Sequence, residues 1–90
     1  MSVETFRKHW FLDRVTSSLG YVVTVKRDRV EVADAGGVIA IDAEWAPGRG
    51  TAMLLFPSSI PDEADRPRRE VVARVERAFA AAGWTVKIHS

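Results

Sequence analysis

Apolar and polar residues alternate with a period of two through the middle of the chain, between residues 21 and 56. Residues 21–27, 29–34 and 38–45 alternate in this way, and residues 51–56 are apolar after the first position. The breaks between these runs are rich in Gly, Pro or charged residues, and each is short enough for a hairpin. The pattern predicts an antiparallel meander of four strands.

Residues 2–19 instead carry apolar side chains at helical spacing and are predicted to form a helix. Ser2 is a suitable N-cap, and Gly20 follows the last periodic position as a C-terminal stop. Trp10 and Phe11 make the apolar stripe wider than one contact with a sheet requires. Either the helix is wedged between the sheet and a second helix, or one of these aromatic side chains is available to a partner.

A second helix is predicted to start at Asp62 or Asp65 and to end just before Gly83. Asp65 is the favoured cap, because Pro67 is tolerated only in the first turn of a helix. Residues 84–89 alternate again and predict a last strand. That strand can run antiparallel beside the first strand, which we favour, or parallel beside the fourth.

These elements predict an α+β fold, a two-layer sandwich in the order α-β-β-β-β-α-β, with both helices packed on one face of the sheet. The sheet is expected to be an antiparallel four-stranded meander plus the C-terminal strand. A chain of 90 residues supports a single hydrophobic core, so residues 1–90 are expected to form one domain.

The register of the meander decides which residues face away from the helices, because a slip of one residue turns every side chain over. We expect Val23 to pair with Val32 and Val32 to pair with Ile41. Continuing through the next turn pairs Ala43 with Leu54.

This register places Met53 and Leu55 in water, on the outer face of a fourth strand that is expected to lie at the edge of the sheet. Exposed apolar residues on an edge strand are either covered or used for binding. Met53 and Leu55, together with Trp10 and Phe11, are therefore the candidate protein-binding residues. The alternative is that the last strand or the loop after residue 56 covers them.

Composition is ordinary for a globular protein, with 47% hydrophobic and 28% charged residues. Thirteen Lys and Arg residues against twelve Asp and Glu residues leave a net charge of +1, so no global field favours nucleic acid or anionic lipid. Arg outnumbers Lys and neither Asn nor Gln occurs, which is typical of a GC-rich bacterium or its phage. No segment reads as a membrane span or a signal peptide, so a cytoplasmic protein is expected.

Basic residues gather at the first hairpin tip and at the start of the second helix, and they support an alternative function, nucleic-acid binding. The candidates for that role are Lys26, Arg27, Arg29, Arg66, Arg68 and Arg69. If the two groups lay side by side, they would make a modest phosphate-binding strip. The chain has no recognition-helix pattern and no aromatic ladder that would read bases.

Catalytic and metal-binding patterns are absent from the sequence. The expected register makes Glu31 and Asp42 face each other, and such carboxylate pairs can bind cations or transfer protons. Here they are expected on an open sheet face, where exposed cross-strand charges are the simpler interpretation. His9 and His89 have no second ligand at metal-binding spacing, and the chain has no Cys.

The sequence therefore predicts a small, non-catalytic protein-binding or regulatory module that needs no cofactor or metal. The partner is expected to be another protein or a second copy of the chain in a homodimer. Neither a membrane nor a small-molecule substrate is indicated.

Overall fold

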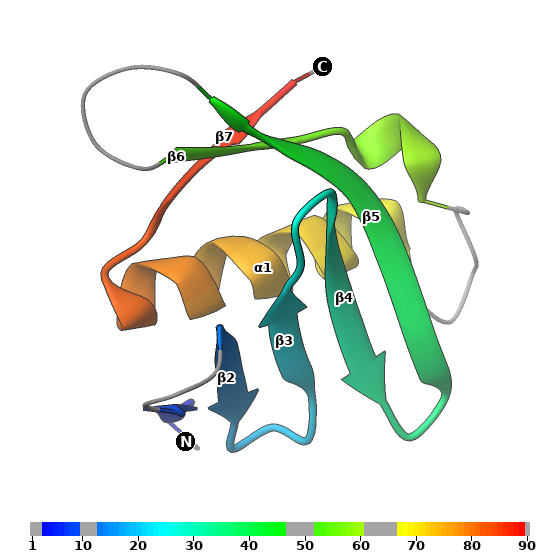
Figure 1. The fold of residues 1–90 in the computed structure, drawn as a ribbon. Helices are drawn as coiled ribbons and strands as arrows, with labels where there is room; N and C mark the ends of the chain where they lie inside the picture. The colour runs from blue at the N-terminus through cyan, green and yellow to red at the C-terminus, as the bar shows by residue number, and fades with distance from the viewer. Residues whose placement is uncertain (1–2, 10–12, 47–51, 61–66, 90) are drawn as a thin grey trace.

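Seven strands, arranged across one sheet in sequence order, form a mostly antiparallel half-barrel in the computed structural model (Figure 1). The structure describes residues 3–9, 13–46, 52–60 and 67–89. The strands are β1 (Phe6–Lys8), β2 (Arg14–Ser17), β3 (Val22–Val25), β4 (Arg29–Asp34), β5 (Gly37–Ala46), β6 (Ala52–Leu55) and β7 (Thr85–Ile88). Within these residues there is one α-helix, α1 (Arg68–Ala82), and a short 3-10 turn, η1 (Pro57–Ser59).

Helix α1 lies against the concave face of the sheet (Figure 1). It contacts β1 and β2 at one end of the strand order and β7 at the other. The long strand β5 makes this curvature possible, because its first half pairs with β4 and its second half pairs with β6. The core between sheet and helix is built from aliphatic residues of both, with Tyr21 and Phe79 as its largest side chains. The helix therefore fills the half-barrel.

The predicted two-helix sandwich is wrong, because the described residues of the range 2–19 form strands and no helix. The described part of this segment holds β1 and β2, which pair with each other, and β2 pairs in turn with β3. Gly20 does adopt a positive φ of 94°, but it closes the turn between β2 and β3 and does not end a helix. Val15 and Ser17 are buried while Thr16 between them is not, which is strand alternation. The β-branched and hydroxyl side chains of β2 also disfavour a helix.

The meander from β3 to β6 exists, and its first hairpin has the predicted register, with Val23 opposite Val32. The next hairpin is shifted by two residues, so that Val32 pairs with Ile39 and not with Ile41. The reason is the turn: Gly36 N–H donates to the Asp34 carboxylate (2.8 Å), which moves the loop one position towards the N-terminus. A shift of two residues keeps the same side chains on the core face.

Helix α1 confirms the second predicted helix in its apolar stripe and its end. Val71, Val75 and Phe79 are buried, and Gly83 follows with a left-handed φ of 78°. The helix starts at Arg68; the two candidate caps, Asp62 and Asp65, lie outside the described residues.

The last strand, β7, runs parallel to β6, the arrangement that we did not favour. The edge of β3 that it was expected to occupy is already taken by β2. The chain from β6 through α1 to β7 is a crossover connection, as parallel neighbouring strands require. Strand β6 is therefore an interior strand, and β7 is an edge of the sheet.

Candidate functional site

Met53 and Leu55, the first candidate binding residues, are fully buried, with 0% of each residue exposed. The observed register pairs Ala43 with Leu55, one residue away from the expected pairing with Leu54. This slip turns β6 over, so the prediction that Met53 and Leu55 face solvent is wrong. Both contribute to the core beneath the sheet. Trp10 and Phe11, the other two candidates, lie outside the described residues.

The residues that β6 presents on the outer face are instead Leu54 and, just after the strand, Phe56. Both are half-buried, and they alternate with the buried Met53 and Leu55. The Phe56 ring meets the His89 ring edge to face, with 5.3 Å between the ring centroids. Strand β6 therefore carries apolar residues on both faces, as the sequence predicts. The residues that face outward are Leu54 and Phe56, and not Met53 and Leu55.

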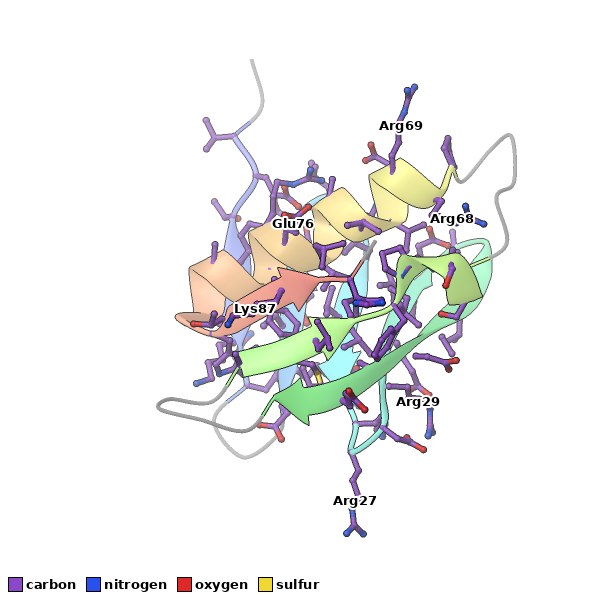
Figure 2. All side chains as sticks on the ribbon, turned by 90° about the horizontal axis from the view of Figure 1, so that it is seen from above. Arg27, Arg29, Arg68, Arg69, Glu76 and Lys87 are labelled. Atoms are coloured by element: carbon purple, nitrogen blue, oxygen red, sulfur yellow. The ribbon has the colours of Figure 1, made fainter. Side chains whose placement is uncertain are left out.

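Strand β7 continues this outer face to the edge of the sheet with polar residues, Lys87 and, just after the strand, His89. In the register, Leu54 stands between Glu44 of β5 and Lys87 of β7, so an acid and a base flank it. Ile88 stands opposite the buried Leu55 and therefore lies on the inner face, where its place at the sheet edge leaves it 39% exposed. We define the β6–β7 surface as Leu54, Phe56, Lys87 and His89, which share the outer face. Lys87 projects from β7 in Figure 2.

The basic residues of the nucleic-acid alternative do not gather into one strip. Arg27 and Arg69 point to opposite ends of the molecule (Figure 2). Arg29 is engaged by Asp28 (3.1 Å) and Glu31 (2.9 Å) beside the hairpin tip.

The remaining candidates for this alternative are also apart. Lys26 is exposed at the β3–β4 hairpin, next to Arg27 in the chain, whose side chain points away from Arg69 (Figure 2). The Arg68 guanidinium donates two hydrogen bonds, at 2.8 and 3.1 Å, to the backbone carbonyl of Ile60. Arg66 lies outside the described residues.

The expected carboxylate pair is not formed. Glu31 stands opposite Ala40, and Asp42 stands opposite Arg29, because of the two-residue shift between β4 and β5. Among the described residues no group of three or more His, Cys, Asp or Glu side chains is arranged to hold a metal ion.

A polar cluster that the sequence did not reveal joins the N-terminal segment to the sheet and the helix. The Glu4 carboxylate accepts hydrogen bonds from the Ser17 and Tyr21 hydroxyls and from Arg77 of α1 (2.8 Å). Arg74, one helical turn before Arg77, stacks over the Tyr21 ring, 4.9 Å from its centroid. Three segments far apart in sequence therefore meet at one carboxylate.

The electrostatics of this cluster follow from its burial and its hydrogen bonds. Burial alone would raise the pKa of Glu4, but the hydrogen bonds from Ser17, Tyr21 and Arg77 outweigh it, so the pKa of Glu4 lies below its ordinary value. Burial and the hydrogen bond to Glu4 raise the pKa of Tyr21. Ser17 also accepts a hydrogen bond from Leu19 N–H (3.0 Å), so its hydroxyl is fully engaged and is not a free nucleophile.

Hydroxyl groups also line a shallow pocket of about 190 Å³ beside β1 and β2. These groups are bonded within the hairpin: the Ser18 hydroxyl accepts from Thr5 N–H (2.8 Å), and Thr16 Oγ1 lies 2.9 Å from His9 Nε2. The pocket is therefore a by-product of the hydroxyl contacts that hold the hairpin. Its lining residues are Thr5, Phe6, Arg7, Thr16, Ser17 and Ser18.

Comparisons with protein-family models, with curated proteins and with solved structures found no match. No helix within the described ranges is long and apolar enough to cross a membrane. The β6–β7 surface is thus the candidate site on the strength of its own geometry.

Proposed function

We propose that this domain acts by binding another protein through the β6–β7 surface. The observation that carries the proposal is the pair Leu54 and Phe56, which lie on the outer face of the sheet next to an edge strand. Aromatic and aliphatic side chains of this kind are frequent anchors at protein interfaces, where a polar rim surrounds them. Glu44, Lys87 and His89 are placed to supply such a rim.

A pull-down from the native host tests the proposal with matched variants. Leu54→Lys places a charge at the centre of the surface, and Val38→Lys places the same charge on the outer face of β5, where Val38 is 63% exposed. Both variants must first give the melting temperature of the wild type within a few degrees. We expect a specific protein that is captured by the wild type and by Val38→Lys to be lost with Leu54→Lys. Equal capture by all three proteins would contradict the proposal.

Light scattering distinguishes a second copy of the chain from a different protein as the partner. If the wild type is a dimer that Leu54→Lys converts to a monomer, the surface binds a second copy of the chain. A wild-type monomer leaves a different protein as the partner. A dimer that survives Leu54→Lys uses another surface.

A further inference from the structure

Strand β7 offers a hydrogen-bonding edge within the β6–β7 surface. It is the last strand in the sheet order, so no described strand pairs with its outer side. Four of the five residues from 85 to 89 are exposed, and only Val86 is half-buried. Unpaired backbone groups on such an edge can pair with an added strand from another chain.

The direction of each backbone group on β7 follows from one hydrogen bond. His89 N–H donates to the carbonyl of Leu55 on β6 (2.9 Å), so the backbone of His89 faces β6. Because successive residues of a strand direct their N–H and C=O groups to opposite sides, Lys87 also faces β6. Val86 and Ile88 therefore direct their backbone groups away from the sheet, towards the open edge.

The two edge strands carry basic residues and no acidic ones, whereas the interior strands carry both signs, with Arg14 in β2 and Arg29 in β4. Both edge strands are basic: β1 contains Arg7 and Lys8, and β7 contains Lys87 with His89 directly after it. Lys8 also lies near the start of β7, with its Nζ 5.1 Å from the Trp84 ring centroid. In the described strands the acidic residues are confined to β4 and β5, and they are Glu31, Asp34, Asp42 and Glu44.

We propose that the partner supplies an extended segment of alternating acidic and apolar residues, which adds to β7 as an eighth strand. Its backbone pairs with Val86 and Ile88. Its acidic side chains lie on the outer face beside Lys87 and His89, and its apolar side chains lie beside Ile88 on the inner side. Lys8 meets the end of the segment nearest Trp84. This inference rests on the proposed function, and it specifies the chemistry of the partner at the same surface.

The test uses a blocked peptide of four Glu alternating with three Val as the probe, and a peptide with Lys in place of Glu as its control. Titration into the ¹⁵N-labelled domain is followed by amide chemical shifts and by amide hydrogen exchange. We expect the acidic peptide to shift the amides of β7 and to slow exchange at Val86 and Ile88, the two outward N–H groups. The Lys peptide is expected to have no effect on them.

Two variants separate the charge contribution from the backbone contribution. Lys87→Glu is expected to weaken binding of the acidic peptide by at least about tenfold and to favour the Lys peptide. Ile88→Pro removes an outward N–H without removing a hydrogen bond to β6, because Pro is tolerated where the missing N–H faces solvent. Ile88→Thr keeps that N–H and is the matched control. Binding is expected to be lost with Ile88→Pro and retained with Ile88→Thr.

Three results would overturn the inference. In the first, neither peptide alters β7, so that Lys87 only protects the edge from pairing. In the second, Ile88→Pro, shown by its amide spectrum to be folded, binds as well as Ile88→Thr. In the third, a single-stranded oligodeoxythymidine shifts the β7 amides and the acidic peptide does not. If the pull-down partner is lost with Leu54→Lys while the peptide has no effect, the proposed function stands and only strand addition is rejected.

Discussion

Replacing Glu4 by glutamine removes the negative charge that holds the N-terminal segment to Tyr21 and to helix α1. The variant keeps the size of the side chain and can still form neutral hydrogen bonds. A hydrogen bond to a charged group contributes roughly 1.5–3 kcal/mol and a neutral one roughly 0.5–1.5 kcal/mol, so each of the three bonds loses roughly 1 kcal/mol. The Arg77 contribution is discounted, because 42% of its side chain is exposed and solvent screens the ion pair.

The expected loss in the free energy of unfolding is therefore about 2 kcal/mol at neutral pH. For a domain of this size, that loss lowers the melting temperature by about 8–16 °C. Urea denaturation and thermal melting measure it, with Glu76→Gln as the control, because Glu76 is exposed on α1. A loss below about 0.5 kcal/mol, equal to that of a typical surface substitution, would refute the argument that this carboxylate ties three segments together.

The pH dependence of the same variant checks the sign of the argument. The pKa of Glu4 is lower in the folded protein than its ordinary value, so the unfolded chain takes up a proton first as pH falls. The stabilisation is therefore fully present above the ordinary pKa of a glutamate, about 4.3, and is lost as pH falls through the lower folded-state pKa. The difference in stability between wild type and Glu4→Gln is expected to shrink below about pH 4.3. A stability difference between the two proteins that grows as pH falls would contradict a lowered pKa of Glu4 in the folded state.

Three further predictions follow from the same structure. The single tyrosine, Tyr21, is expected to ionise above its ordinary pKa in an absorbance titration, and Glu4→Gln lowers that midpoint; unchanged midpoints would count against the hydrogen bond. Met53→Ala is expected to cost about 2–5 kcal/mol in denaturation and Leu54→Ala about 1 kcal/mol or less, and the reverse order would reject the β6 register. Gly83→Ala is expected to cost about 1 kcal/mol, because Gly83 has φ 78°, and an unchanged melting temperature would contradict this.

The hairpin from β3 to β4 shows what the sequence determines well. Strict alternation, β-branched residues and a charged two-residue tip all specify the same structure, and the predicted pairing of Val23 with Val32 is observed. The stripe of α1 and its glycine stop are equally local signals. Where local propensity and periodicity agree, the fold could be predicted without tertiary information.

The N-terminal segment shows why the rest could not be predicted. Its apolar residues fit a helical period, and Gly20 suits both a helix end and a hairpin turn. Tertiary interactions favour strands in this segment. Buried Ser17 needs a hydrogen-bond partner, and Glu4 and Tyr21 supply it only once the sheet has formed. The wrong prediction of a first helix also led to a wrong predicted position for β7, because β2 occupies the edge of β3 that β7 was expected to take.

Strand β6 shows a limit of a different kind, and it affected the candidate site directly. Because residues 52–56 are apolar throughout, a register slip of one residue exchanges one apolar pair for another and alternation cannot choose between them. The prediction of an apolar outer surface at this strand was therefore independent of register, but the identity of its residues was not. Leu54 and Phe56 stand where Met53 and Leu55 were expected.

The net charge of +1 does not show how the charged residues are distributed over the sheet. In the described strands, acidic residues occur only in the interior strands β4 and β5, whereas the two edge strands carry basic residues and no acidic ones. Edge lysines oppose the pairing of identical edges, since two copies of β7 aligned antiparallel about Lys87 would bring like charges together. The same lysines attract a strand of opposite charge. A surface that repels its own copy and attracts an acidic strand discriminates between partners, so the charges on β7 argue for a different protein, and against a second copy, as the occupant of this edge.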